Sequence, residues 1–559
     1  MENIRFLLIV VFAMLLYMLW EAWQVDYGPK PEVTAIEQPV IDSKEDLPTT
    51  SVIESPQSET KSNIPETETA TPDVSAVPLL EAQSDKIITV ETDVYHLEID
   101  TKGGALRNLD LLKYPVSKDN PDKVVRLFNS EIDKLYLGQS GLISAGGSPS
   151  LPTHHSIFSS DKEKYVLTDE INILKVPLTW TDSHGFTVTK TYFFKRGSYD
   201  VKLEQKITNH SNQSWSGRQY IQLLRKPYKD KNGNTFIRTY AGGVIYTEEE
   251  KYQKIKFGDM ESENLKVQTK GGWVAMIQHY FASAWIPPQD KINTLYTKKL
   301  KDQRYVIGAY TEPVTIPAGS EKTLVATLFA GPKIQPMMEK VAKGLELTVD
   351  YSWLTFIGKP IYWLLNKIYS LVGNWGFAIM GVTLCIKLLF FPLSQASYKS
   401  MAKMRKIQPR LQELKEKFGD DRQRFNTEMM NLYKKEKVNP LGGCLPILVQ
   451  IPVFIALYWV LVETVELRQA PFALWIQDLS AKDPFYILPV LMGITMKIQQ
   501  SLNPAPVDPL QAKVMKMFPI IFTVFFLFFP AGLVLYWVVN NTLSIIQQWV
   551  ITKQIEKEK

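Results

Sequence analysis

The 559-residue sequence contains only two cysteines, Cys385 and Cys444, and six histidines, all between residues 96 and 279. Neither cysteine has a His or a second Cys at the spacing of a zinc site, so we expect two small buried hydrophobes without a disulfide. The sequence also lacks a Ser-His-acid set, paired intramembrane carboxylates and a nucleotide-binding motif. These absences predict a protein that is not an enzyme, with no catalytic residues, no cofactor and no metal.

A strong excess of either charge is also missing, because the formal net charge is only +5 with 22% charged residues. A mean hydropathy of -0.10 would suit an ordinary soluble protein. The apolar residues are nevertheless concentrated at the extreme N-terminus and beyond residue 370. We therefore expect a large soluble domain attached to a multi-pass α-helical membrane domain.

The N-terminal residues contain the apolar run Phe6–Trp20, followed by bulky side chains that make a poor signal-peptidase site. We expect residues 1–24 to be a retained transmembrane anchor, and a cleaved signal peptide is the alternative. Residues 25–84 are rich in Pro, Glu, Ser and Thr and poor in aromatics. That composition predicts a disordered linker, because too little apolar surface is available to offset chain entropy.

Residues 85–335 alternate apolar and polar side chains, as at Tyr95, Leu97 and Ile99, which indicates half-buried strands. Long amphipathic helices are missing from this region, and the pattern predicts one large all-β sandwich. Turn signals separate the strand segments, namely Gly103-Gly104, Asn232-Gly233 and Ala318-Gly319.

Residues 346–370 combine aromatic and aliphatic side chains with two lysines, which predicts an interfacial amphipathic helix in the lipid headgroup region. An amphipathic helix packed on the sandwich is the alternative. The core at 371–553 contains five apolar segments that, with the anchor, make six transmembrane helices. We expect helix 2 at about 372–393, a cytoplasmic hairpin at 394–440, helix 3 at 441–462, an outer loop at 463–484, helix 4 at 485–501, a cytoplasmic loop at 502–515, helix 5 at 516–530, helix 6 at 531–551 and a cytoplasmic tail at 554–559.

Basic residues set the expected orientation of these helices. Residues 394–440 carry twelve Lys and Arg against six acidic residues, whereas residues 463–484 carry two against four. Positively charged loops remain in the cytoplasm, so we expect both termini there and the sandwich outside.

The loop at 394–440 repeats apolar residues at helical steps on both sides of Gly419-Asp420-Asp421, which predicts a two-helix hairpin. Its basic face would suit ribosomal RNA, anionic lipid or an acidic partner; a solvated hairpin whose charge only sets topology is the alternative. The basic residues include Lys399, Lys403, Arg405, Lys406, Arg410, Arg422 and Arg424.

A single charged residue, Lys387, interrupts the stretch Trp375–Leu393. A lysine at mid-span costs roughly 2.5 to 3.5 kcal/mol, so it usually faces a protein interior or a water-filled cavity. Alternatively, Lys387 extends to the cytoplasmic headgroups and polar residues of other spans only bridge packed helices. The polar residues expected to share a hydrated cavity with it are Thr383, Gln450, Gln499, Thr523, Tyr536, Asn540, Ser544 and Gln547.

Three segments carry a family resemblance: Asn439–Pro446 (NPLGGCLP), Val465–Phe472 (VELRQAPF) and Phe529–Tyr536 (FPAGLVLY). They closely resemble the YidC/Oxa/Alb family of membrane protein insertases, over nearly all of residues 350–553. The domain before residue 350 resembles the periplasmic domain of the Gram-negative form. The resemblance implies a cell inner membrane protein with a five-helix insertase core and a galactose-mutarotase-like supersandwich in the periplasm.

The family implies a hydrophilic cationic groove, open to the cytoplasm and to lipid, with a positive side chain in its first core helix. That position matches Lys387, where arginine is usual in this form of the family. Thr383, Tyr536 and Trp537 match substrate-contacting positions, and Trp537 replaces a common tyrosine.

The implied function is insertion and folding of nascent inner-membrane proteins, alone or with the Sec translocon (SecYEG and SecDF). The ribosome, the signal-recognition-particle receptor and membrane lipids are further implied partners, with no small-molecule substrate. The alternative is a small-solute transporter or channel with a carbohydrate-binding exported domain. A cell-envelope sugar enzyme would require acid and base residues that converge in the sandwich.

Overall fold

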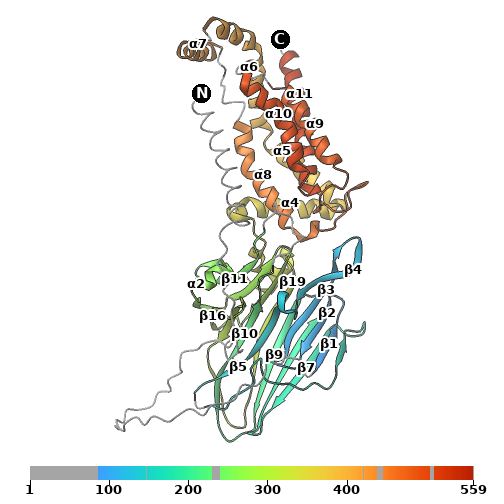
Figure 1. Ribbon diagram of the computed structural model, residues 1–559, viewed down its shortest axis with the longest axis vertical. Helices are drawn as coiled ribbons and strands as arrows, with labels where there is room; N and C mark the ends of the chain where they lie inside the picture. The colour runs from blue at the N-terminus through green and yellow to red at the C-terminus, as the bar shows by residue number, and fades with distance from the viewer. Residues whose placement is uncertain are drawn as a thin grey trace, which may run out of the picture. The chain divides into compact units, whose positions relative to one another are not determined.

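A computed structural model of the protein describes residues 86–146, 148–228, 239–418, 421–436, 438, 445–503 and 509–557 (Figure 1). The expected anchor at 1–24, the expected linker at 25–84, Cys444 and the Asn232-Gly233 turn lie outside these ranges. The described residues form a β domain followed by a helical region.

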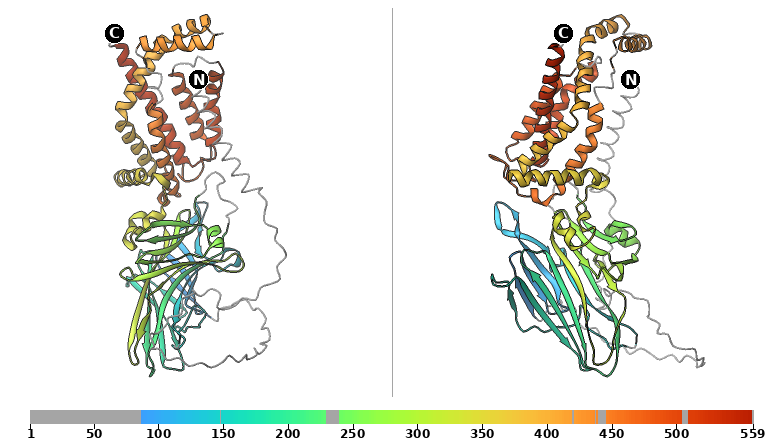
Figure 2. Two further views of the ribbon diagram at one scale, coloured as in Figure 1. Left: turned by 90° about the vertical axis from the view of Figure 1, so that its left-hand side faces the viewer. Right: turned by 180° about the vertical axis from the view of Figure 1, so that it is seen from behind.

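The β domain is built from two sheets packed face to face, and the predicted all-β supersandwich is confirmed (Figure 2). One sheet runs in the order β13-β16-β17-β10-β5-β3-β2-β1-β6, with β18 beside β10 and β4 beside β3, and the other in the order β12-β11-β14-β15-β19-β9-β8-β7. Within the described residues the strands are β1 (Ile87–Glu91), β2 (Tyr95–Asp100), β3 (Ala105–Ser117), β4 (Asn120–Phe128), β5 (Tyr136–Ser144), β6 (Lys164–Val166), β7 (Ile173–Thr181), β8 (Phe186–Lys195), β9 (Asp200–Asn209), β10 (Trp215–Arg225), β11 (Gly242–Thr247), β12 (Lys251–Ile255), β13 (Lys266–Lys270), β14 (Trp273–Gln278), β15 (Phe281–Ile286), β16 (Ile292–Lys299), β17 (Tyr305–Thr311), β18 (Val314–Ile316) and β19 (Glu321–Pro332).

The alternation seen in the sequence explains how the strands bury one face. Tyr95, Leu97 and Ile99 of β2 all lie in the core, at most 1% exposed. Between β2 and β3 the chain turns at Gly103, whose φ of 72° favours glycine. A Cβ at this position would lie 2.2 Å from the carbonyl oxygen of His154, so the turn also requires glycine for space.

The helical region follows the β domain in the chain. Its α-helices are α3 (Gln335–Val341), α4 (Thr355–Val372), α5 (Trp375–Leu389), α6 (Phe391–Phe418), α7 (Arg422–Lys435), α8 (Leu445–Glu463), α9 (Ile487–Ser501), α10 (Pro509–Phe526) and α11 (Ala531–Lys557), while the short α2 (Phe257–Ser262) belongs to the β domain. The 3₁₀ turns are η1 (Ile132–Lys134), η2 (Leu345–Thr348), η3 (Ser352–Leu354) and η5 (Val465–Leu467).

The expected helix at 372–393 is broken. α5 ends at Leu389 and α6 starts at Phe391, with a bend of 66° between them. Pro392 has no amide hydrogen to donate to the carbonyl four residues earlier, which favours a break here. Among the described residues no single helix is both long and apolar enough to cross a membrane by itself, whereas α5 and α6 taken together meet that requirement.

Helix α10 also differs from its expected range. It begins at Pro509, before the expected start at 516, and ends at Phe526. The earlier start includes Lys513, which the expected range left out because only the apolar part of the helix was counted. The polar first turns of a helix carry no apolar signal, so hydropathy places its start too late.

Helix α4 lies crosswise to the longer helices (Figure 2) and packs against α5 and α8. Ile361, Tyr362 and Leu365 are buried on one side, while Phe356 and Trp363 are 70% and 65% exposed on the other. The helix ends at Gly373, whose φ of 65° is left-handed, and Asn374 then caps α5 by accepting a hydrogen bond from the amide of Phe377 (3.1 Å).

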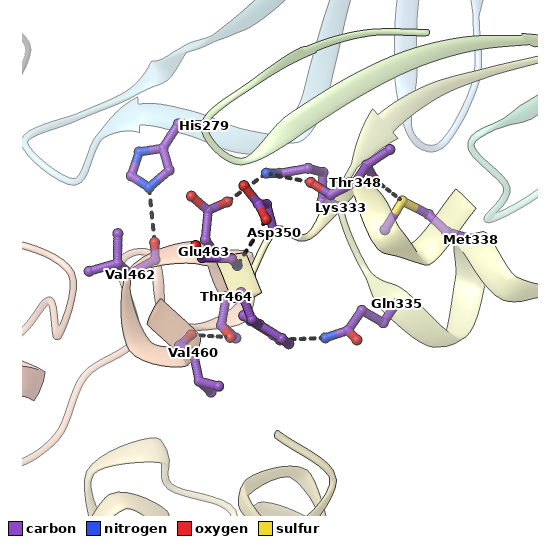
Figure 3. A network of polar contacts seen from close by, with 12 residues as sticks. His279, Lys333, Gln335, Met338, Thr348, Asp350, Val460, Val462, Glu463 and Thr464 are labelled. Carbon is purple, nitrogen blue, oxygen red and sulfur yellow. Dashed lines mark hydrogen bonds and ion pairs between the residues drawn. The ribbon is translucent and has the colours of Figure 1, made fainter. Parts of the chain in front are cut away.

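A buried ion pair joins the end of the β domain to α8 (Figure 3). Lys333 follows β19 and Glu463 ends α8; the two side chains are almost completely buried, with Nζ and Oε2 2.7 Å apart. Lys333 also donates to the carbonyl oxygen of Thr348 (3.2 Å). Nearby, Nε2 of His279 contacts the carbonyl oxygen of Val462 at 2.9 Å, and burial lowers the pKa of His279 to about 4.

One lysine lies inside the β domain without a carboxylate partner among the described residues. Lys190 of β8 is fully buried, and its Nζ donates to the carbonyl oxygens of Gly103 (2.5 Å) and Ser140 (2.9 Å). It also lies 5.0 Å from the ring centroid of Phe158. Burial lowers the pKa of Lys190 from 10.5 to about 7.

We predict that Lys190 makes the stability of the β domain depend on pH between about 7 and 10.5. In this window the unfolded chain holds a proton on Lys190 that the folded chain lacks. The free energy of unfolding therefore rises with pH by up to about 1.4 kcal/mol per pH unit, and below pH 7 the full cost of the buried charge remains. Lys190→Met should remove this slope in thermal unfolding of the full chain followed by tryptophan fluorescence.

Lys202→Met, at a half-exposed lysine of the neighbouring strand β9, is the matched control and should keep the wild-type slope. Equal slopes for the wild type and Lys190→Met would contradict the prediction.

We also predict that Lys333→Met destabilises the junction by about 3 to 5 kcal/mol, because it leaves the Glu463 carboxylate buried without its partner. The double variant Lys333→Met/Glu463→Met should recover most of this loss, since neither charge then remains buried. A double-mutant cycle on urea unfolding of the full chain measures the coupling. Additive effects of the two single changes would rule out an energetic pair.

Candidate functional site

A cavity of about 260 Å³ lies among the core helices. Five of the described helices contribute to its wall, and most of the lining residues have polar side chains. The lining residues are Lys387, Ser394, Ser397, Tyr398, Met401, Gln450, Ile451, Phe454, Met496, Gln499, Asn503, Tyr536, Trp537, Asn540, Asn541 and Ser544, and we refer to this space as the polar cavity.

Lys387 of α5 supplies the charge of the polar cavity. The residue is only 4% exposed, and its Nζ donates to Oγ of Ser544 on α11 at 2.7 Å. Ser544 in turn donates to the carbonyl oxygen of Asn540 (2.7 Å), and Nε2 of Gln547 donates to the carbonyl oxygen of Lys387 (3.4 Å). The ion pairs among the described residues do not include Lys387, so its ammonium group faces the cavity as an uncompensated charge. The surface position that the alternative interpretation required is not adopted.

The bend between α5 and α6 brings the start of α6 to the same cavity. Ser394 and Ser397 are each 3% exposed, and Tyr398 lies beside them in the wall. Sequence reasoning missed these residues because it assigned everything after 393 to a cytoplasmic hairpin. A signal was present, since Ser394, Ser397, Tyr398 and Met401 follow helical three- and four-residue steps.

Aromatic residues also line the cavity. The ring of Tyr536 lies 5.8 Å from that of Phe454, and Trp537 lies 4.9 Å from the same ring. Nε1 of Trp537 is buried and has no hydrogen-bond partner among the described residues. A buried N–H without a protein partner normally binds water or a ligand, so Trp537 keeps a donor although it lacks the hydroxyl of tyrosine.

Most of the expected groove residues therefore meet at one place. Lys387, Gln450, Tyr536, Trp537, Asn540 and Ser544 line the polar cavity, as does Gln499.

Thr383 does not line the polar cavity, contrary to expectation. Its hydroxyl donates to the carbonyl oxygen of Ile379 at 2.7 Å and is buried within the packed helices. Thr383 shares a helical face with Lys387 but lies one turn away along the axis, beyond the end of the cavity. Thr523 is not among the described residues that line the cavity either, and its hydroxyl donates to the carbonyl oxygen of Pro519 (2.7 Å).

The outer surface of the same helices is apolar. On α5, Leu384, Leu388 and Leu389 are 46%, 61% and 74% exposed, and Cys385 is exposed among them. The expectation that Cys385 is buried was wrong, because a small apolar side chain suits a lipid-facing position as well as a protein core. Exposed apolar residues also cover α10, including Met517, Phe518, Ile520, Ile521, Val524 and Phe525.

Helices α6 and α7 form the expected hairpin, held together by a small apolar cluster of Met404, Ile407, Leu411, Met429 and Leu432. Asp421 caps α7 by accepting from the amide of Arg424 (3.0 Å). The side chains of Lys399, Lys403, Arg405, Lys406, Arg410 and Arg424 are exposed, whereas that of Arg422 lies outside the described part. Several of these basic residues contact other groups: Arg410 pairs with Glu436 (2.6 Å), Arg405 donates to the carbonyl oxygen of Leu502, and the guanidinium group of Arg424 lies 4.9 Å from the ring centroid of Phe418.

Comparison with known proteins gives family matches over most of the chain. Residues 87–364 match the family described as the YidC periplasmic domain, and residues 367–558 match the family described as 60Kd inner membrane protein. Among curated proteins, the membrane protein insertase YidC of Methylococcus capsulatus is 57% identical over 558 residues, covering 100% of this chain and 99% of the relative. That of Nitrosococcus oceani is 50% identical, with both chains covered completely.

Solved structures were also matched. A crystal structure of an active YidC insertase with its first transmembrane domain resolved covers 83% of this chain and 92% of its own, at 19% identity and a TM-score of 0.38. A galactose mutarotase-like protein from Lactobacillus casei covers 44% of this chain and 99% of its own, at 12% identity and a TM-score of 0.32.

The two sequence families account for nearly all of the described chain, and the full-length relatives share half or more of its residues. The chain therefore belongs to the YidC family of membrane protein insertases, which are inner-membrane proteins and not enzymes.

Proposed function

We propose that this protein inserts nascent inner-membrane proteins by receiving a polar or acidic segment in the polar cavity. The observation that carries the proposal is the buried ammonium group of Lys387, which has no carboxylate partner among the described residues and faces a cavity lined by hydroxyl and amide groups. A charge in this position is costly unless it is solvated or paired. An acidic group of a client chain would supply the missing countercharge.

The strength of this attraction suits transient capture. Two opposite charges about 4 Å apart gain roughly 1 kcal/mol in bulk water and 4 kcal/mol at an intermediate dielectric. Water and polar side chains in the cavity also lower the cost of bringing a hydrophilic segment into the membrane. The client is therefore attracted and can still leave.

The route out of the cavity is supported by Ile451 of α8. This residue lines the polar cavity and is 43% exposed, so the cavity wall continues to the apolar surface of the helix. A hydrophobic client segment can move along this surface into lipid, because lipid tails solvate apolar side chains as well as the protein does.

The proposed topology places both termini and the α6–α7 hairpin in the cytoplasm, with the β domain in the periplasm. It is supported by the excess of basic residues at 394–440. The exposed Trp353, Phe356 and Trp363 support a position for α4 at the outer surface of the membrane, where amphipathic aromatic side chains are favoured.

The cytoplasmic hairpin is the proposed contact for the ribosome and the signal-recognition-particle receptor. Its exposed lysines and arginines provide a surface suited to nucleic acid phosphates and acidic partners. Insertion would proceed alone or together with the Sec translocon (SecYEG and SecDF). Membrane lipids would contact the exposed apolar surfaces of α5 and α10.

We predict that Lys387→Glu reduces insertion of a small client with an acidic translocated tail by at least about tenfold, since reversing the charge turns capture into repulsion. Lys387→Arg, which keeps the charge, should retain most activity. The measurement is protease protection of a client translated in vitro in the presence of proteoliposomes that contain each variant. If Lys387→Glu inserts the client as well as the wild type does, electrostatic capture by residue 387 is not part of the mechanism. Rapid solute flux across the same proteoliposomes, without insertion of the client, would favour a transporter.

A second prediction concerns which side of α11 meets the client. A photocrosslinking amino acid at Asn540, which lines the polar cavity, should crosslink to a ribosome-bound nascent chain. The same probe at Thr542, which is exposed on another side of α11, should crosslink to lipid or to neither. Equal nascent-chain crosslinks from the two positions would show that the client does not enter the cavity.

A further inference from the structure

A second and larger cavity, of about 680 Å³, lies where the β domain meets the end of α8. Its wall includes Arg225 at the end of β10, Gln278 at the end of β14, Tyr280 between β14 and β15, Val462 of α8 and Arg468 of the following loop. We refer to it as the junction cavity. It is separate from the polar cavity, because the two cavities have no lining residue in common in the described part of the chain.

The junction cavity is cationic. Among the described residues that line it, five are basic and one, Asp478, is acidic. Three of the basic residues have carboxylate partners: Arg126 pairs with Asp110 (2.7 Å), Lys134 with Glu131 (3.2 Å) and Lys226 with Asp133 (3.6 Å). The Asp478 carboxylate accepts from the amides of Gln469 and Ser480 and from the Ser480 hydroxyl; these donors are neutral, so its negative charge remains and acts on Arg468. Arg225 and Arg468 have no carboxylate at ion-pair distance among the described residues, and their two positive charges exceed the single negative charge of Asp478.

Arg225 is 8% exposed, and its guanidinium group is not paired with a carboxylate among the described residues. Nη2 donates to Oε1 of Gln278 at 2.8 Å and Nη1 to the carbonyl oxygen of Ile277 at 3.4 Å. The group also lies 4.7 Å from the ring centroid of Tyr136. Two neutral acceptors leave most of its five donors and its whole charge uncompensated, and burial lowers the pKa of Arg225.

Arg468 approaches from the helical region. Its Nη2 donates to the carbonyl oxygens of Pro115 (2.6 Å) and Val116 (3.1 Å), which are again neutral acceptors. Gln469 donates to the same Pro115 oxygen at 2.9 Å. The loop that carries Arg468 is thus held against β3, and the guanidinium group stays at the cavity wall.

We propose that the junction cavity binds a phosphate group, and that the source of this group is the headgroup of an anionic phospholipid. Two arginines with unfilled donors match the planar, bidentate recognition of phosphate oxygens. A volume of 680 Å³ exceeds what a phosphate ion needs and leaves room for a headgroup, within the usual range of ligand cavities.

The lipid source rests on the topology given under the proposed function. In that topology the last turn of α8, which lines the cavity through Leu461 and Val462, ends at the outer membrane surface. Lipid phosphates lie at that level. A bound headgroup would neutralise the two arginines and hold the β domain, α8 and the loop after it together.

The test is native mass spectrometry of the delipidated full chain in detergent after addition of phosphatidylglycerol. The wild type should retain one tightly bound phosphatidylglycerol that Arg225→Gln and Arg468→Gln bind about tenfold more weakly, as expected for loss of one charge-assisted interaction. Arg218→Gln is the matched control: it lies on the same strand, and its guanidinium group lies 5.2 Å from the ring centroid of Tyr310, yet it does not line the cavity.

Arg468→Gln keeps the test valid if the buried Arg225→Gln variant does not fold. In a parallel arm, inorganic phosphate is added to the lipid-bound chain. Displacement of the lipid by phosphate, with the same dependence on the two arginines, supports the phosphate site and identifies the free ion as a second source. The proposal is overturned if both variants retain the lipid as the wild type does. Equal retention of diacylglycerol, which has no phosphate, or preference for a polyglutamate peptide over both phosphate probes would also overturn it.

Discussion

The structure of the helical region depends on one constraint, the presence of an ammonium group inside an apolar helix. Lys387 cannot be buried among hydrocarbon without a large cost, so its neighbours must be polar. Ser544 meets this requirement directly through a 2.7 Å hydrogen bond, and the amide and hydroxyl groups around the cavity meet it collectively. The bend after α5 serves the same end, because it brings Ser394 and Ser397 to the charge.

The helical region also has a second set of buried charges at the opposite end of α8. Glu463 closes that helix and is paired with Lys333 of the β domain, while Glu466 in the next turn accepts a hydrogen bond from Tyr362 of α4 (2.8 Å). Burial raises the pKa of Glu466. α8 therefore contributes Gln450 to the polar cavity near one end and an ion pair with the β domain at the other.

Sequence reasoning succeeded where one residue type was strongly constrained by its surroundings. A lysine within an uncharged stretch identified Lys387, and period-two alternation identified the strands of the supersandwich, which is confirmed. The prediction that Thr383 lines the cavity was wrong, because the 3.6-residue period shows which face of a helix a residue occupies but not how far a cavity extends along that face. Hydropathy failed at Phe390, since it cannot distinguish a straight helix from a bent one. Arg225 and Arg468 come together only through tertiary packing, so no local pattern could have paired them.

The central claim is that residue 387 faces water that is continuous with the cytoplasm. The most direct measurement is alkylation of a Lys387→Cys variant, in a background with Cys385 and Cys444 replaced by serine, by a membrane-impermeant maleimide applied separately to each side of sealed vesicles. The account predicts rapid modification from the cytoplasmic side and none from the other. Protection from both sides would mean that the position is dry, and modification only from the periplasmic side would reverse the proposed access.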